Sequence, residues 1–356
     1  MSRSDPTTAR KRVEELTLAL CAIPSITGDE AACAERVAAL LGPTPFQVER
    51  IGLSILARSP PRGRPLVLLV GHTDTVPGPP GAERVGSRIV GLGASDMKGG
   101  LAVMLALAER VDLDACPYDL GLVFYDKEEG PWSDSGLGPV LDGAPWLRDA
   151  ALAFCLEPSD NVVQVGCLGT LHARVTFHGK AAHSARPWQG HNAIHAAGDL
   201  LVRLGARAPV DVDRDGFRFR EVISATLAQG GRTRNVIPDT FTLNLNYRYA
   251  PGRDPSSAEA EIRRFVGEGP TVEIVELAPS GPVVTQNPLL QRFLSLNGNR
   301  VEAKQAWTDV ARLGAAGIDA VNLGPGHTAQ AHQAGEFLEV ALLHQSLDQF
   351  ERFLLP

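Results

Sequence analysis

Histidine and carboxylate side chains follow four short apolar segments of this chain, an arrangement that suits metal chemistry. Asp96, in a glycine-rich turn that leads into a helical pattern, adds a further potential ligand. Ligands gather at the carboxyl ends of the strands in open α/β sheets, so these side chains should converge. Imidazole and carboxylate ligands together suit Zn²⁺, with Co²⁺ or Mn²⁺ able to replace it. The four ligand-bearing segments are residues 71–74, 125–130, 157–158 and 327–332.

The candidate ligands suffice for two metal ions. A two-metal site has one carboxylate that bridges the ions and further ligands on each of them. Asp96 is placed to bridge. His72 and Glu157 would hold one ion, and Glu129 and His332 would hold the other. The three carboxylates, together with a hydroxide, would balance the charge of two zinc ions, so we expect two Zn²⁺ per subunit.

Two further acidic residues have roles beside the ligands. Asp74 lies two residues after His72, where its carboxylate can accept a hydrogen bond from the imidazole and orient it. Glu128 and Glu129 are adjacent, so one can bind a metal ion while the other stays free as a general base. The pattern therefore indicates a hydrolytic metal site.

Each candidate also has a simpler explanation when it is taken alone. Asp96 would be an ordinary helix N-cap. The Glu128–Glu129 pair would be a solvated turn, and His332 a surface or core histidine. The convergence of several ligand types at strand ends is what favours a metal site.

The order of apolar patterns indicates an α/β fold. In the first half, short apolar runs at 66–70, 120–124 and 151–156 alternate with helical spacing, as at 98–110. Strands that alternate with helices form a mostly parallel sheet with helices on both faces. A buried-strand pattern returns at 318–323.

The middle of the chain follows a different pattern. Apolar and polar residues alternate in 171–177 and in 241–249, which is typical of antiparallel strands with one exposed face. The order of elements is β-α-β-β-α-β, a ferredoxin-like unit. We expect 169–278 to be this α+β domain, inserted into a metal-binding catalytic domain made of 1–168 and 279–356.

Composition and charge narrow the classes of partner. The 356 residues suffice for about two domains, and a hydrophobic content of 44% is that of a folded protein. The formal net charge of −7 and the lack of a Lys/Arg tract argue against nucleic acid and anionic membranes and favour a small molecule. No apolar run approaches the ~18 residues of a membrane helix, and residues 13–23 have the spacing of an amphipathic helix. Five cysteines without a C-x-x-C pair indicate reduced thiols in a cytoplasmic protein.

Seven motifs occur in the following order: His72-Thr-Asp-Thr-Val-Pro77, Ser95-Asp-Met-Lys-Gly-Gly100, Glu128-Glu-Gly130, Glu157-Pro158, residues 179–187 with His183, Asn235-Val-Ile-Pro-Asp239, and Gly324-Pro-Gly326 with Ala331-His332. Together they resemble the dinuclear-zinc amidohydrolase and peptidase family over nearly the whole chain. The family includes succinyl-diaminopimelate desuccinylases, acetylornithine deacetylases, aminoacylases and zinc carboxypeptidases. Within it, segments 169–170, 182–186, 190–195 and 307–310 most resemble the desuccinylases of actinobacteria.

The resemblance implies the same five metal ligands and the same role for Asp74, which orients His72. It also implies that Glu128 is the general base. It also implies that His183, in the inserted domain, stabilises the oxyanion, either within its own subunit or across a dimer. In its Ala-His setting, His332 is the expected ligand, although His327 competes with it. The residues expected to bind carboxylates of the substrate are Asn235, Arg248, Gly324, Gly326 and Arg186.

The resemblance further implies hydrolysis of a linear amide in a homodimer formed through the inserted domain. The leading substrate is N-succinyl-LL-diaminopimelate, an intermediate of lysine and diaminopimelate synthesis; acetylornithine, another N-acyl amino acid or a dipeptide is an alternative. A non-catalytic amino-acid-binding regulatory protein is an alternative from another class, but such a protein has no use for a free base such as Glu128. One departure from the family pattern is Gln333-Ala334-Gly335 before Glu336, where acidic residues commonly follow the ligand histidine; we expect it to alter the surroundings of the site.

Overall fold

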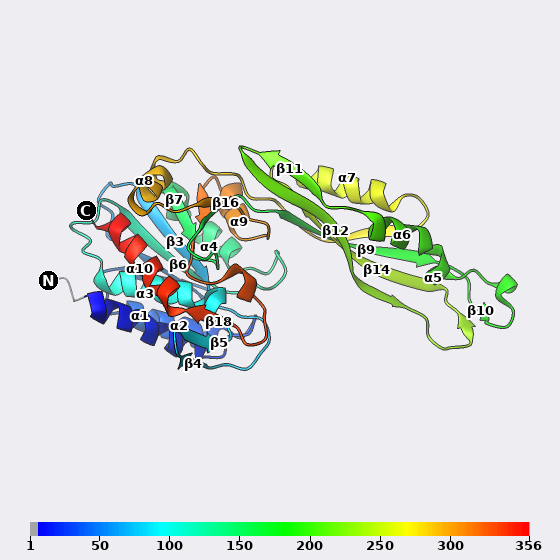
Figure 1. Ribbon diagram of the computed structural model, residues 1–356, viewed down its shortest axis with the longest axis horizontal. Helices are drawn as coiled ribbons and strands as arrows, with labels where there is room; N and C mark the ends of the chain where they lie inside the picture. Colours follow the sequence, from blue (N-terminus) through cyan, green and yellow to red (C-terminus); the bar gives the residue numbers. More distant parts are fainter. Residues whose placement is uncertain (1–5, 356) are drawn as a thin grey trace. The chain divides into compact units, whose positions relative to one another are not determined.

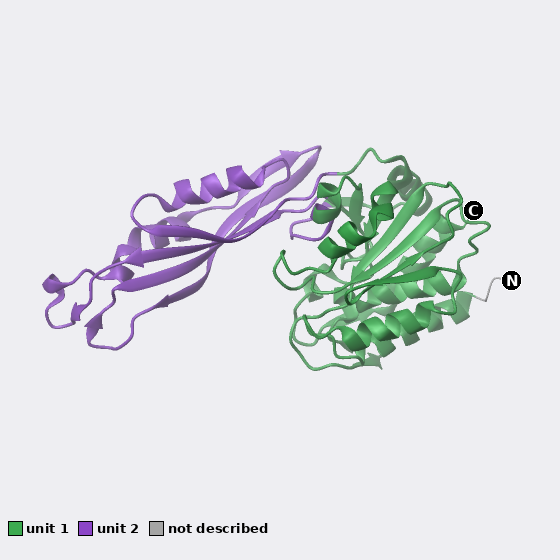
Figure 2. Cartoon of the chain, turned by 180° about the vertical axis from the view of Figure 1, so that it is seen from behind, with its two compact units in different colours: residues 1–165, 284–302, 312–356 green, residues 166–283, 303–311 purple. Residues whose placement is uncertain are grey.

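The computed structural model describes residues 6–355, which form two compact units (Figure 2). Unit 2 consists of Gly166–Val283 and Ala303–Ala311, and unit 1 consists of the other described residues. Unit 2 is wider than the inserted domain expected from the sequence, because its first segment extends beyond 169–278 at both ends and because it takes in the second segment. One contact that holds this segment is the hydrogen bond from Trp307 Nε1 to the Pro279 carbonyl, at 3.1 Å.

Unit 1 is built on an eight-stranded sheet with a parallel centre (Figure 1). In spatial order the strands are β1 (Gln47–Ile51), β2 (Ser54–Arg58), β6 (Asp119–Tyr125), β3 (Leu66–His72), β7 (Ala150–Cys155), β17 (Ala320–Asn322), β8 (Val163–Val165) and β16 (Val301–Ala303). β3 pairs in parallel with β6 and with β7, and β17 pairs in parallel with β7. β1, β2 and β8 pair antiparallel toward the edges. The predicted α/β fold is confirmed, with antiparallel strands added at both sides of the parallel centre.

Helices cover the sheet and bury its central strands. The helices are α1 (Pro6–Cys21), α2 (Ala31–Leu41), α3 (Gly99–Arg110), α4 (Leu137–Gly143), α8 (Pro288–Asn297), α9 (Val310–Ala315), which crosses the unit boundary, and α10 (Val340–Leu354). α1 packs on α3 and α10, and α8 packs on α10 and β7. Every residue of β3 and β6 is buried, as expected for parallel strands covered on both faces. The carboxyl ends of these strands are therefore held rigidly.

A second, three-stranded antiparallel sheet in unit 1 brings residues 337–339 beside the segment that precedes Asp96. Its strands are β4 (Ala82–Val85), β5 (Arg88–Gly91) and β18 (Phe337–Glu339), with β5 in the middle. Phe337 lies opposite Val90 in this sheet. The pairing places the residues after His332 next to the turn that carries Asp96.

Unit 2 has the β-α-β-β-α-β order predicted from the alternating pattern. Its antiparallel sheet has the order β11 (Val210–Arg214), β12 (Phe217–Gly230), β14 (Thr240–Tyr249), β9 (Gly169–His178) and β15 (Thr271–Ala278). The helices are α5 (Ala193–Ala196), α6 (Gly198–Ala206) and α7 (Pro255–Val266). β11 is an edge strand beyond the expected unit. A short two-stranded sheet joins β10 (Ala182–His183) to β13 (Val236–Ile237).

The core of unit 2 follows from the period of two in its strands. Leu171, Ala173 and Val175 of β9 point to the buried face, together with Leu245 and Tyr247 of β14. Residues between them lie on the opposite, polar face. One face of the sheet is therefore free to carry polar side chains.

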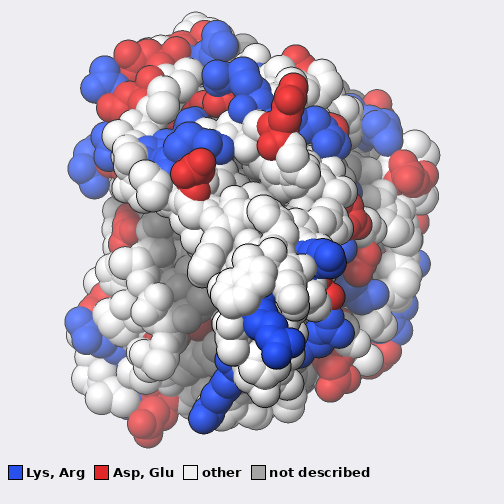
Figure 3. Space-filling model, turned by 90° about the vertical axis from the view of Figure 1, so that its right-hand side faces the viewer, with Lys and Arg blue, Asp and Glu red and all other residues white. Residues whose placement is uncertain are grey.

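Charged side chains of both signs lie on the surface, and the cysteines are buried. Figure 3 shows acidic and basic side chains interspersed on the face in view, without a continuous area of one sign. Within residues 6–355, no helix combines the length and the apolar character needed to cross a membrane. All five cysteines are buried free thiols.

Candidate metal centre

The structure brings the five predicted ligands together at the carboxyl ends of the central strands. His72 is the last residue of β3, Glu129 lies in the loop after β6, and Glu157 lies two residues after β7. Asp96 lies in the short helical turn η1 (Ala94–Lys98), and His332 lies in the loop before β18. All five residues belong to unit 1.

Asp96 stands between two groups of ligands. Its Oδ1 atom lies 3.3 Å from Nε2 of His72, and its Oδ2 atom lies 3.7 Å from Nε2 of His332. Glu157 Oε1 is 3.9 Å from the same nitrogen of His72. Glu129 Oε2 is 2.8 Å from Nε2 of His332. The carboxylate of Asp96 therefore offers one oxygen to each side, the geometry of a bridging ligand.

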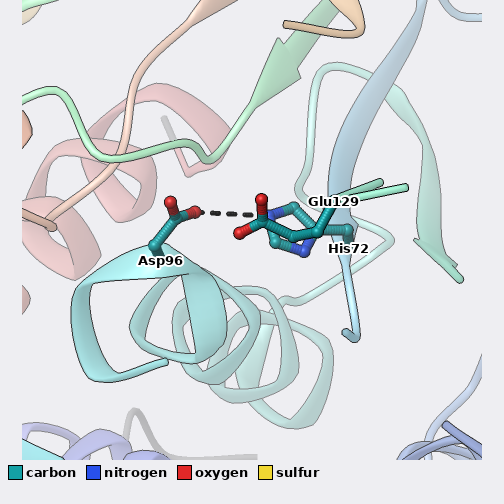
Figure 4. A group of neighbouring side chains, drawn as sticks. All are labelled: His72, Asp96 and Glu129. Atoms are coloured by element: carbon teal, nitrogen blue, oxygen red, sulfur yellow. Dashed lines mark hydrogen bonds and ion pairs between the residues drawn. The ribbon is translucent and has the colours of Figure 1, made fainter. Parts of the chain in front are cut away.

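A compact subset of these residues forms the centre of the group. Figure 4 shows Asp96, Glu129 and His72 directed toward one another, with the contact between Asp96 and His72 marked. One ligand atom from each of the three lies within 4.8 Å of the others. The side chains of Glu129 and Asp96 are 8% and 11% exposed, and that of His72 is fully buried. Carboxylates held this close and this far from water repel one another unless a cation or a proton lies between them.

Asp96 is not the N-cap of the following helix. The residue at the cap position of α3 is Lys98, and no side-chain cap hydrogen bond forms there. Asp96 instead has an extended backbone, with φ −120° and ψ 91°, and Gly93 before it has a left-handed φ of 77°. This backbone turns the carboxylate of Asp96 toward the histidines.

Asp74 is the anchor of the centre. Nδ1 of His72 lies 3.3 Å from Asp74 Oδ1 and 3.1 Å from the Asp74 carbonyl oxygen. The same carboxylate accepts the backbone N–H groups of Glu128 and Glu129, each at 3.0 Å, and the hydroxyl of Thr27 at 2.9 Å. Sequence reasoning anticipated the contact with the imidazole but missed the two backbone hydrogen bonds. With Nδ1 engaged in this way, Nε2 is directed into the centre.

The acidic surroundings raise the pKa of both imidazoles. Burial opposes a charged His72, but hydrogen bonds to Asp74 and Asp96 outweigh it and raise its pKa well above the ordinary histidine value. For His332, the hydrogen bond to Glu129 is the largest influence and raises the pKa against the effect of burial. The carboxylates that favour a positive charge on the imidazoles would also favour a divalent cation, which binds neutral imidazole. The donor set therefore fits a metal ion.

Glu336 is a functional candidate that sequence reasoning treated only as part of a departure from the family pattern. Its carboxylate, 3% exposed, accepts backbone N–H groups from Gly93, Ser95 and Asp96. Its position four residues after His332 was the available signal. Residues 333–335 separate His332 from Glu336, whose carboxylate lies within hydrogen-bond distance of the turn that carries Asp96.

His327, the alternative to His332, is engaged elsewhere. Its Nδ1 atom pairs with the carboxylate of Asp160, and its backbone N–H donates to Ser95 Oγ at 3.1 Å. Its ring packs edge-on against Phe337. The structure therefore places His332, and not His327, against the carboxylates of the centre.

Gly324 and Gly326 lie in a turn that packs closely on the ligand-bearing loops. A Cβ atom on Gly324 would meet the Leu156 carbonyl oxygen at 2.2 Å, and one on Gly326 would meet the Ser95 carbonyl oxygen at 2.3 Å. Only glycine fits at these two positions. The turn thus has a packing role beside Glu157, and contact of its backbone with a substrate stays a prediction.

The remaining predicted residues lie in unit 2, in two places. His183 and Arg186 are exposed near Asn235, whose backbone carbonyl accepts the Ser184 N–H at 2.9 Å. Arg248 lies on the polar face of β14, where its Nε donates to Asn246 Oδ1 at 3.1 Å and where burial lowers its pKa.

Curated relatives share most of the chain. A Mycobacterium tuberculosis protein described as "Putative succinyl-diaminopimelate desuccinylase DapE" is 39% identical over 345 residues, which cover 96% of this chain and 97% of that protein. A Corynebacterium glutamicum protein described as a succinyl-diaminopimelate desuccinylase is 35% identical over 338 residues, 90% of each chain.

Solved structures share the fold. An aminopeptidase PepT from Bacillus cereus superposes with a TM-score of 0.78 at 18% identity, covering 97% of this chain and 98% of the other. A tripeptidase from Staphylococcus aureus gives a TM-score of 0.79 at 20% identity and covers 97% of both chains. At these identities the likeness concerns the fold alone.

The family expected from the seven motifs is confirmed by an independent match. The sequence profile of peptidase family M20/M25/M40 matches residues 68–355, which include all five predicted ligands. Family membership and the His, Asp and Glu side chains gathered at the strand ends agree with each other. The chain therefore belongs to peptidase family M20/M25/M40, a family of metallohydrolases.

Proposed function

We propose that this protein removes the succinyl group from N-succinyl-LL-diaminopimelate by hydrolysis of its amide bond. The division of the Asp96 oxygens between His72 and His332 is the observation that carries the hydrolytic part of the proposal. The choice of substrate is supported by the relatives at 35% to 39% identity, whose descriptions name a succinyl-diaminopimelate desuccinylase. Acetylornithine or a dipeptide is the second candidate, because the chain belongs to a peptidase family.

The proposed cofactor is a pair of zinc ions. His72 and Glu157 would hold one ion, and Glu129 and His332 would hold the other. Asp96 would contribute one oxygen to each. When bound, such ions polarise an amide carbonyl and make water acidic enough to act as a nucleophile near neutral pH.

The protein's own groups would move the protons and hold the substrate. Glu128 accepts the proton of the attacking water at its side-chain carboxylate and delivers it to the leaving amine. Asp74 accepts the backbone N–H of Glu128 and so fixes the main-chain position from which the Glu128 side chain extends. His183 donates a hydrogen bond to the developing oxyanion. The groups proposed to bind the carboxylates of the substrate are Asn235, Arg248, Arg186, Gly324 and Gly326.

We also propose that the protein acts in the cytoplasm as a homodimer formed through unit 2. Support comes from exposed apolar side chains: Val202 of α6 and Leu227 of β12 are each 71% exposed. V202D and L227D should each give a monomer in sedimentation, and V85D, at an exposed apolar position of unit 1, should leave the dimer intact. A wild-type monomer at micromolar concentration would contradict this part of the proposal.

A parallel substrate assay tests the proposed reaction. Protein freed of metal and then reloaded with zinc is offered N-succinyl-LL-diaminopimelate, N-acetylornithine and a small set of dipeptides. We expect kcat/KM to be highest for the succinyl substrate. A higher value for acetylornithine or a dipeptide would replace the proposed substrate, and no hydrolysis of any of them would contradict amide hydrolysis of this class. The chain belongs to a family of hydrolases, which speaks against the alternative of a non-catalytic binding protein.

A further inference from the structure

Glu336 is a buried carboxylate whose hydrogen bonds all go to the turn that carries Asp96. Oε2 accepts the N–H of Gly93 at 2.8 Å, and Oε1 accepts the N–H groups of Ser95 and Asp96 at 2.7 and 2.9 Å. The carboxylate therefore holds three points of one short backbone segment, the last of them at Asp96 itself.

Neighbouring contacts tie the same two segments together. The Glu336 carbonyl accepts the Gly91 N–H at 2.9 Å, and the Ser95 hydroxyl donates to the Phe337 carbonyl at 2.8 Å. These contacts continue the pairing of β18 with β5. The turn that leads to Asp96 is thus fixed to residues 336–337 by both backbone and side-chain hydrogen bonds.

The position of Glu336 in the chain links the two halves of the metal centre. His332, four residues earlier, contributes its imidazole beside Glu129. The same short segment therefore supplies one ligand directly and holds the backbone of Asp96, the residue that faces both histidines. A displacement of this segment would change the geometry at both halves at once.

We infer that Glu336 is a positioning residue that fixes the Asp96 carboxylate between His72 and His332, so that binding of the second metal ion depends on it. The inference rests on the proposed two-metal site. Loss of one oxygen acceptor at Glu336 releases the turn. The Asp96 carboxylate is then held less firmly between His72 and His332. Residues that orient metal ligands from outside the ligand set commonly change metal affinity or activity by about 10- to 100-fold when they are replaced.

Two substitutions at position 336 separate the effect of the carboxylate charge from the effect of side-chain length. In E336Q the side-chain NH₂ group must face at least one of the three backbone N–H groups, so at least one donor loses its acceptor. E336D keeps the charge but is shorter by one methylene and cannot span the same distance. E339Q is the matched control, because Glu339 lies on the same strand β18 but pairs with Arg88, away from the turn.

Metal titration of the metal-free proteins tests the inference without relying on activity. Isothermal titration with Zn²⁺ or Co²⁺ should give two ions for the wild type and for E339Q. For E336Q and E336D the weaker of the two ions should bind 10- to 100-fold less tightly. Thermal unfolding of the metal-free proteins identifies any variant that fails to fold, and E336D then stands in for E336Q.

Steady-state kinetics provide the second measurement. In the variants at position 336, kcat should fall while KM stays within about twofold of the wild-type value, because the proposed effect is on ligand geometry. Two ions bound by folded E336Q and E336D as tightly as by the wild type would overturn the inference and leave the two-metal site standing. A wild type that binds fewer than two ions would overturn the proposed site itself, and the inference with it.

Discussion

Asp74 accepts the backbone N–H of Glu128 at 3.0 Å. The same carboxylate also lies 3.3 Å from Nδ1 of His72. One buried side chain therefore orients an imidazole of the metal centre and fixes the backbone of the proposed base. The pKa of Asp74 is lowered despite burial, because His72 and the backbone N–H groups stabilise its ionised form. The anchor is therefore a charged acceptor at the junction of two loops.

Replacing Asp74 with Asn should lower kcat without abolishing metal binding. The amide cannot accept all the hydrogen bonds that Asp74 accepts, and its NH₂ group would face a backbone donor. A 10- to 100-fold decrease is expected, as for other groups that orient metal ligands. T27V, which removes a single hydroxyl donor to Asp74, should have a smaller effect. D74N with wild-type kcat would show that the anchor is dispensable.

Replacing Glu128 with Gln should separate binding from chemistry. The variant should keep two metal ions, since Glu128 is outside the proposed ligand set, and lose hydrolysis by about 10²- to 10⁴-fold because the proton acceptor is gone. E129Q is the matched comparison at the next residue, and it should lose metal ion instead, because Glu129 contacts His332 at 2.8 Å. Metal content and kcat measured on both variants check the assignment. Equal loss of metal in both variants would contradict the assignment of Glu128 as a base outside the ligand set.

His332 and His327 should behave differently when each is changed to Ala. H332A should bind one metal ion less tightly, because His332 lies against Glu129 and Asp96. H327A should bind metal like the wild type, since His327 pairs with Asp160. Titration of metal-free protein with Zn²⁺ measures both. A loss of metal in H327A alone would identify His327 as the ligand.

The buried thiols should resist modification and make the protein sensitive to alkaline pH. Burial raises the pKa of Cys21 to about 12 and that of Cys167 to about 11. Because the thiolate is the reactive form, thiol reagents at pH 8 should modify the folded protein slowly and the unfolded protein rapidly at all five cysteines.

The same pKa values fix the direction of the effect on stability. A thiol whose pKa is higher in the folded state holds its proton there after the unfolded chain has lost it. The contribution to stability is complete below the unfolded pKa of about 8.5 and is lost as the pH rises toward the folded values of about 11 and 12. Unfolding by urea at pH 7 and pH 10 should show lower stability at pH 10. C21A and C167A should reduce this difference, and an unchanged difference would assign it to other groups.

The sequence by itself determined the central strands, the antiparallel strands of the inserted domain and the family. Apolar runs at 66–70 and 120–124 have no alternation, and a strand of this kind is stable only when both faces are covered, which places it in the centre of a parallel sheet. The alternation in 241–249 has one polar face, and an antiparallel sheet with one buried face results. Local pattern is enough here because burial acts on each residue according to its face. The order of motifs identified the family in the same way, from residue types at fixed positions.

Tertiary structure alone decided which backbone groups the buried carboxylates would hold. Asp74 reaches backbone N–H groups more than fifty residues away, and Glu336 reaches the turn before Asp96 across more than 240 residues. Backbone donors are the same at every residue, so no side-chain pattern marks the ones that a distant carboxylate will accept. The separation of His332 from His327 and the return of 303–311 to unit 2 depend in the same way on packing between segments that are remote in the chain.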